Sequence, residues 1–79
     1  MASTAISGTI ADLTLIRNEC LVVMKDSGGH VQAPLTLPMS NNPNYNAMFS
    51  ALLLASANRY VVDLTSETDG IYIIKVHAQ

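Results

Sequence analysis

This chain of 79 residues is short, weakly charged and rich in apolar residues. The length permits a single domain, residues 1–79, and a domain of this size buries only about 60% of the surface of its unfolded chain. Charged residues make up 13% of the chain, whereas roughly 25% is typical of soluble domains. One cysteine and two histidines are too few for an intrachain disulfide or a Cys/His zinc site. We therefore expect copies of the chain to stabilise one another, without metal or cofactor.

The charge balance also argues against several classes of partner. A net charge of −2 with four basic residues provides no basic surface for nucleic acid or anionic lipid, so no nucleic-acid partner is expected. No apolar run reaches the ~18–20 residues of a membrane-spanning helix, so no membrane insertion is expected. The N-terminal stretch MASTAISGTIADL lacks the basic and apolar segments of a secretion signal. This favours a cytoplasmic location, or a secreted one if a leader has been removed.

The first half of the chain carries the pattern of three strands. Apolar residues alternate over 4–16 but change phase near Ala11–Asp12, which predicts one long strand with a bulge, and Gly8 suits a close backbone approach. A β-branched run at 20–25 predicts the second strand. After a glycine-rich turn, alternation over 31–37 predicts a third, half-buried strand. Because short turns join these strands, we expect antiparallel pairing.

A helix and two more strands complete the predicted fold. Asn42 is a suitable N-cap and Pro43 suits the first helical position, so we expect a helix over 43–58 with a left-handed C-cap at its last residue or the next. Residues 60–65 and 71–76 are predicted to be strands joined by a tight turn. A long bent strand, two strands, a helix and two strands is the element order of the OB-fold. We therefore expect a mainly β protein: a five-stranded antiparallel Greek-key barrel with one helix between strands three and four.

Reactive side chains show no arrangement typical of an enzyme. Cys20 begins an apolar strand and is interpreted as a packed small hydrophobic residue, with no base to activate it. His30 and His77 are interpreted as solvated imidazoles. The acids near the last hairpin lack the ligand spacing of a calcium loop; they are Asp63, Glu67 and Asp69. We therefore expect a protein that is not an enzyme.

The predicted helix is uncharged and apolar on every side. One side can cover the core of the domain, and small residues on another side permit close approach to the helices of neighbouring copies. A large apolar side chain left in water costs roughly 1.5–3 kcal/mol. We therefore predict an oligomer interface on this helix, formed by Met48, Ala51, Leu52, Leu54 and Ala55. The alternative is a helix buried entirely within its own domain.

Four segments of the chain occur in this order: SGTI, CLVVMK, NAMFSALLLASANRYVVDLT and DGIYIIKV. With them the chain resembles the ring-forming, receptor-binding B subunits of bacterial AB-type toxins, most closely the Shiga toxin B subunit. The resemblance spans nearly the whole chain. It implies a homopentamer whose helices line a central pore and whose strands pair between neighbouring barrels. Such toxin subunits also carry a secretion signal and a disulfide, which this sequence lacks.

The resemblance and the OB-fold together indicate where a ligand would bind. OB-folds often bind ligands on strands two and three and the adjacent loops, and sugar sites combine polar side chains with one aromatic surface. By position against the toxin family, the candidate residues are Asn18, Glu19, Gln32, Thr36 and Tyr45. The expected function is binding of a glycan, a small ligand or a protein partner by a homopentameric ring. Two alternatives remain: an ordinary polar surface at these positions, and single-stranded nucleic-acid binding, which needs a basic groove and stacking aromatics.

Overall fold

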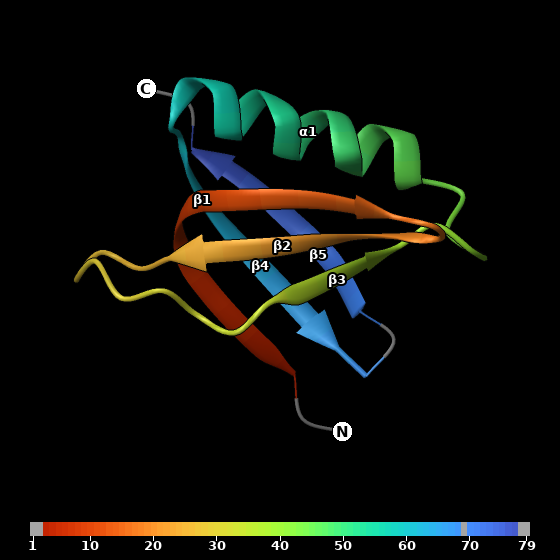
Figure 1. Ribbon diagram of the computed structural model, residues 1–79, viewed down its shortest axis with the longest axis horizontal. Coiled ribbons are helices and arrows are strands. Elements are labelled where there is room, and N and C mark those ends of the chain that lie inside the picture. Colours follow the sequence, from red (N-terminus) through yellow and green to blue (C-terminus); the bar gives the residue numbers. More distant parts are fainter. Residues whose placement is uncertain (1–2, 69, 78–79) are drawn as a thin grey trace.

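The computed structural model, which describes residues 3–68 and 70–77, contains five strands and one helix in the predicted order (Figure 1). All strand pairings are antiparallel, in the spatial order β3-β2-β1-β4-β5. The mainly β class is therefore confirmed. The elements are β1 (Thr4–Ile16), β2 (Glu19–Lys25), β3 (Leu35–Pro38), α1 (Tyr45–Asn58), β4 (Val61–Glu67) and β5 (Gly70–His77).

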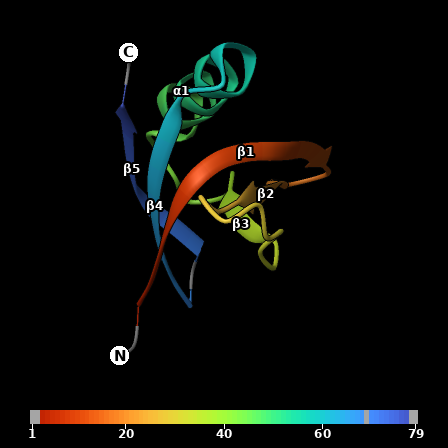
Figure 2. The same ribbon diagram turned by 90° about the vertical axis from the view of Figure 1, so that its left-hand side faces the viewer.

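The long strand β1 belongs to both halves of the sheet because it bends. Its first half, Thr4–Gly8, pairs with β4, and its second half pairs with β2. The register shifts between Ile10 and Asp12, which confirms the predicted bulge. The predicted close approach at Gly8 is also present, against the carbonyl group of Lys25. Figure 2 shows β1 curving, so that the β4–β5 half and the β2–β3 half lie at a steep angle to each other.

The sheet is not closed into the predicted barrel. Its edge strands, β3 and β5, approach each other at one end, where Gly70 lies against the carbonyl oxygen of Thr36 and the ring of Pro38. Within the described residues no ladder joins these two strands. Pro38 has no N–H group to donate to such a ladder. The strand order and the approach of β3 to β5 leave an open, strongly curved sheet.

β3 is also shorter than the strand predicted over 31–37. It has four residues, and Pro34 immediately precedes it. Since proline cannot donate a ladder hydrogen bond, it confines regular pairing to the segment after it. Farther upstream, Val31 forms a single bridge with Lys25.

The helix begins two residues later than predicted because a local turn precedes it. Asn42 accepts hydrogen bonds from the N–H of Asn44 through its side chain and from the N–H of Tyr45 through its carbonyl. Asn44, rather than Asn42, takes the N-cap position, and it makes no side-chain cap. At the other end, Arg59 adopts the left-handed conformation (φ 57°, ψ 36°), which is one of the two predicted C-cap positions.

The core lies between α1 and the concave side of the sheet. Alternate residues of β2 and β4 are buried, as expected for strands with one face on a core. Cys20 is among the fully buried side chains, which agrees with its interpretation as a packed hydrophobic residue. The core consists of Cys20, Val22, Met24, Leu37, Tyr45, Leu52, Ala55, Val62, Leu64 and Ile71.

The structure corrects part of the predicted helix interface. Leu52 and Ala55 are fully buried in the chain's own core, because residues three and four apart share a helix face with Tyr45 and Met48. They therefore offer no surface to a neighbouring copy. Leu54 points away from this face and is 55% exposed. Within the described residues, no helix reaches the length and apolarity needed to cross a bilayer.

Candidate functional site

A surface cleft of about 370 Å³ lies where β3 approaches the connection between β4 and β5. We call it the ligand cleft. Two carboxylates lie on its rim, Glu19 at the start of β2 and Glu67 at the end of β4. Leu35 and two prolines form an apolar wall. The hydroxyl groups that line the cleft belong to Thr36, Ser66 and Thr68.

Strand register explains how these side chains meet. Glu19 pairs with Pro38, and Leu21 pairs with Thr36. Paired residues share a sheet face, so Glu19 and Thr36 project on the same side of the sheet, opposite the buried residues of β2. Gly70 then brings β4 and β5 close. A Cβ there would lie 2.7 Å from the Thr36 carbonyl oxygen, so this approach requires glycine.

The predicted ligand residues divide into two groups in the structure. Asn18 adjoins Glu19 in the β1–β2 turn, where its carbonyl accepts a hydrogen bond from the N–H of Met39 at 2.9 Å, so these residues and Thr36 lie in one region. Gln32 is elsewhere, with its amide donating to the Asp26 carboxylate at 2.9 Å.

Tyr45 also lies outside the cleft. It is 9% exposed and stacks on Phe49, with ring centroids 5.8 Å apart. It therefore forms part of the core and offers no aromatic surface to a sugar.

Sequence reasoning missed the contribution of β4 and its turn to this cleft. The sequence pattern places Ser66, Glu67 and Thr68 in the turn between the last two strands and gives them no part in a binding site. The glycine that ends this turn was the only local signal, since it permits a close approach. Asp69, the other acid of this turn, lies outside the described residues.

A serine, an aspartate and a histidine meet on the outer face of the β1–β4–β5 half. Ser7 donates a hydrogen bond to one carboxylate oxygen of Asp63, and His77 Nε2 lies 2.8 Å from the other. The Ser7 hydroxyl, and then His77, hold the pKa of the Asp63 carboxyl below its usual range. In serine hydrolases the histidine lies between the serine and the acid, so that it can take the serine proton. Here the carboxylate lies between them, and the group links three strands without activating Ser7.

Metal ligands are not clustered in the described part of the chain: residues 3–68 and 70–77 contain no group of three or more histidine, cysteine, aspartate or glutamate side chains that could hold an ion. His30 is 81% exposed and lies 3.6 Å from Asp26. His77 is partly exposed and contacts Asp63 alone among the described carboxylates.

A second feature of the surface is apolar. The outer side of α1 carries Leu53, 47% exposed, and Leu54, with alanine and serine around them and no charged residue in the helix. Beside the helix runs a groove of about 310 Å³, which we call the α1–β5 groove. Its walls include Met48 and Ala51 of the predicted interface, with Tyr72 and Ile74 on the other side. Among the residues that the structure describes, β5 pairs only with β4, which leaves its other backbone edge open beyond Gly70.

Comparisons with known protein families, with curated proteins and with solved structures find no match for this chain. Its function therefore has to be inferred from these surfaces.

Proposed function

We propose that this chain is a non-catalytic binding module that assembles with copies of itself into a ring, for which a pentamer is favoured, as in the toxin B subunits that it resembles. The observation that carries the proposal is the apolar surface that extends from the outer side of α1 to the open edge of β5. Leu53, Leu54 and Tyr72 are all about half exposed there. A second copy would remove this surface from water, which stabilises the assembly by about 25 cal/mol for each Å² of apolar surface buried.

The strand order supports an OB-fold subunit that is open between β3 and β5. β1 pairs with both β2 and β4, and α1 lies between β3 and β4 in the chain. These features belong to the OB-fold, which is itself a partly open Greek-key barrel. The contact of Gly70 with Thr36 and Pro38 lies at the position where such a barrel would close.

The edge of β5 supports assembly by strand pairing. An exposed, apolar edge strand is a template for a strand of another chain, and main-chain hydrogen bonds would provide affinity while the α1–β5 groove receives alternate side chains. A closed ring needs two different surfaces that complement each other. The two edge strands of the open sheet, β3 and β5, would be two such surfaces, while the outer side of α1 would pack against a neighbouring helix.

We propose the ligand cleft as the binding site of each subunit, with a glycan as its ligand class. Sugar hydroxyls can donate to Glu19 and Glu67, and the Thr36 hydroxyl can both donate and accept. The apolar wall at Leu35 can pack against the C–H groups of a sugar ring. This site uses the predicted residues Glu19 and Thr36, with Asn18 adjacent to Glu19 in the chain, but not Gln32 or Tyr45.

The test of assembly is a solution mass by light scattering, supported by native mass spectrometry. We expect the native chain to be oligomeric at micromolar concentration. Leu54→Glu should give a folded monomer because it places a charge on the apolar surface, whereas the control Thr14→Glu, on the exposed part of β1, should remain assembled. A native chain that is monomeric at this concentration would contradict the proposal.

The ligand cleft is tested separately on a glycan array. We expect a defined set of glycans to bind the native chain and not the variant Glu19→Gln/Glu67→Gln. Gln32→Ala should bind the same glycans because its side chain lies outside the cleft. Equal binding by the double variant would remove the cleft from the proposal but leave the assembly intact.

A further inference from the structure

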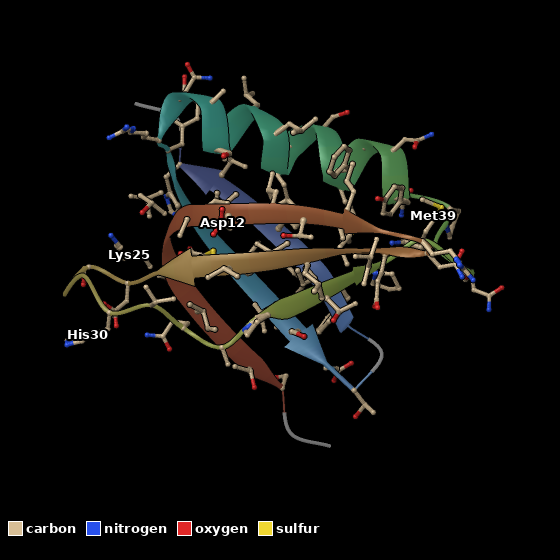
Figure 3. All side chains as sticks on the ribbon, viewed as in Figure 1. Asp12, Lys25, His30 and Met39 are labelled. Carbon is tan, nitrogen blue, oxygen red and sulfur yellow. The ribbon has the colours of Figure 1, made fainter. Side chains whose placement is uncertain are left out.

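A second cleft, of about 570 Å³, lies between β1 and the C-terminal end of α1. Two of the four basic residues of the chain, Lys25 and Arg59, line it, together with the hydroxyl-bearing Thr9 and Ser56. We call it the basic cleft. Lys25 ends β2 and Glu19 begins it, so these two residues lie about 20 Å apart along the strand. Figure 3 shows Lys25 at the opposite end of the molecule from Met39, which follows β3 near the ligand cleft.

The fold brings these four side chains together from three elements. Lys25 is paired with Thr9 across the β1–β2 ladder, so their side chains share a face. Arg59 follows α1 directly, and its N–H is directed back to the carbonyl of Ser56 at 3.4 Å. Two cations and two hydroxyl groups therefore line one cleft.

Neither Lys25 nor Arg59 forms an ion pair with another described residue, so both cations are available to a ligand. The ion pairs among residues 3–68 and 70–77 involve histidines, namely His30 with Asp26 and His77 with Asp63, and neither Lys25 nor Arg59 takes part. Uncompensated cations that line one cleft attract an anion.

The nearest acid in sequence, Asp26, is occupied by its own loop. One of its carboxylate oxygens accepts the N–H groups of Gly28 and His30, each at 2.9 Å, and the other accepts the Gln32 amide at 2.9 Å. The backbone N–H of His30 contributes most to lowering the pKa of Asp26. Its carboxylate is therefore held by the loop rather than by Lys25.

The C-terminal end of α1 also repels an anion less strongly than the end of an uncapped helix would. The C-terminal carbonyls of a helix carry partial negative charge, but three of them here have donors. Asn58 donates to Leu54 through its side chain, Tyr60 donates to Ala55, and Arg59 donates to Ser56.

From this geometry we infer that the basic cleft binds an oxyanion of the phosphate type, carried by a small soluble molecule. The guanidinium of Arg59 can donate two parallel hydrogen bonds to such a group, and Lys25 adds a compact charge. Thr9 and Ser56 can donate to the remaining oxygens. Two cations and a lining without aromatic side chains suit one phosphate group better than a nucleic-acid strand. This inference does not depend on the proposed assembly.

The experiment is a titration of the isotope-labelled full chain, followed by backbone amide NMR, with inorganic phosphate and with glucose 6-phosphate. We expect saturable shifts at residues 9–11, at Lys25 and at 56–59. The variant Lys25→Gln/Arg59→Gln should bind at least about tenfold more weakly, as expected for the loss of two charge-assisted contacts. The control Arg17→Gln/Lys75→Gln removes the same net charge elsewhere and should bind within about twofold of the native chain.

Several results would overturn the inference. Equal weakening in both double variants would show a response to net charge alone. Absence of saturable shifts at millimolar phosphate would exclude the site. Binding only to vesicles with phosphatidylserine, or only to an oligothymidylate, would replace the small ligand with a lipid surface or a nucleic acid. Chemical denaturation of each variant verifies folding, and the single variants Lys25→Gln and Arg59→Gln provide the same comparison if the double variant is unfolded.

Discussion

The backbone of Gly8 in β1 lies against the carbonyl group of Lys25 in β2, closer than any residue with a Cβ would allow. At this point β1 ends its pairing with β4 and begins its pairing with β2. The contact therefore lies where the two halves of the sheet meet, and it depends on the missing side chain. It also positions the end of β2, from which Lys25 reaches the basic cleft.

We predict that Gly8→Ala lowers the free energy of unfolding by about 1–3 kcal/mol or more, because the added methyl group forces the two strands apart. Urea denaturation followed by circular dichroism measures this change. The control is Gly28→Ala, whose methyl group would meet the exposed His30 ring. Since that ring can move, the control should change stability by less than about 0.5 kcal/mol. Equal stability of the Gly8 variant and the native chain would contradict the role given to this contact.

A pair of leucines in α1 separates stability from assembly. Leu52 is fully buried and Leu54 is 55% exposed, so we predict that Leu52→Ala lowers the free energy of unfolding by about 2–5 kcal/mol at any protein concentration. Leu54→Ala should lower it only where the native chain is assembled, because association adds stability by mass action. Urea denaturation at micromolar and at nanomolar concentration distinguishes the two. A concentration-independent loss in the Leu54 variant would place Leu54 in the monomer's own packing.

These leucines also show why sequence pattern did not identify the buried side of the helix. A β-branched apolar run was enough to predict β2, and the structure buries its alternate residues Cys20, Val22 and Met24. In α1 apolar residues occur on every side, so a period of 3.6 selects no single face. Leu52 and Leu54 are chemically identical, and only contacts with the sheet determine which one is buried.

The ligand cleft was predictable only in part, for a related reason. Glu19 and Thr36 lie on neighbouring strands, β2 and β3, and the predicted antiparallel pairing was enough to bring them together. Glu67 reaches the same cleft because Gly70 packs against Thr36, a contact between the two edges of the sheet. Local pattern cannot predict how strongly β1 bends, and that bend determines how closely those edges approach.

The hydrogen-bonded group of Ser7, Asp63 and His77 should make the stability of the fold depend on pH in the acid range. The pKa of Asp63 is lowered, first by the Ser7 hydroxyl and then by His77, so the unfolded chain takes up a proton at higher pH than the folded chain does. The group therefore stabilises the fold at pH values above 3.8, the ordinary pKa of an aspartate. This contribution is lost as the pH falls through the lower pKa of the folded chain. We predict that Asp63→Asn is less stable than the native chain at pH 6 and loses less stability between pH 5 and pH 2.

The measurement is urea denaturation across this pH range. Asp12→Asn is the control, because the Asp12 carboxylate makes no hydrogen bond or ion pair within the described residues. The stability of this control should vary with pH as that of the native chain does. If the stability of Asp63→Asn varied with pH in the same way, the link between Ser7, Asp63 and His77 would have no energetic role.

Burial of Cys20 should make its thiol inert in the folded chain. Desolvation raises the pKa of the Cys20 thiol, so both access and thiolate content are low. We predict that an aromatic disulfide reagent labels the native chain slowly and that the rate rises with urea in parallel with unfolding. Cys20→Ser should lower stability by about 1–3 kcal/mol, since a hydroxyl group is more costly than a thiol to bury in an apolar core, and Cys20→Ala should lower it less. Rapid labelling without urea would contradict this account.

The Arg59 side chain is expected to lower the stability of the fold through its backbone conformation and to strengthen phosphate binding to the basic cleft. Arg59 holds a left-handed conformation, which is disfavoured by about 1–2 kcal/mol for a residue with a Cβ and is unstrained for glycine. We predict that Arg59→Gly raises the free energy of unfolding by about 1 kcal/mol and weakens phosphate binding to the basic cleft. Arg59→Ala separates the two effects, because it removes the guanidinium but keeps the Cβ. It should weaken binding as much as Arg59→Gly does, without the gain in stability. Denaturation and phosphate titration of both variants test this, and full phosphate affinity in either variant would show that the side chain has no part in the cleft.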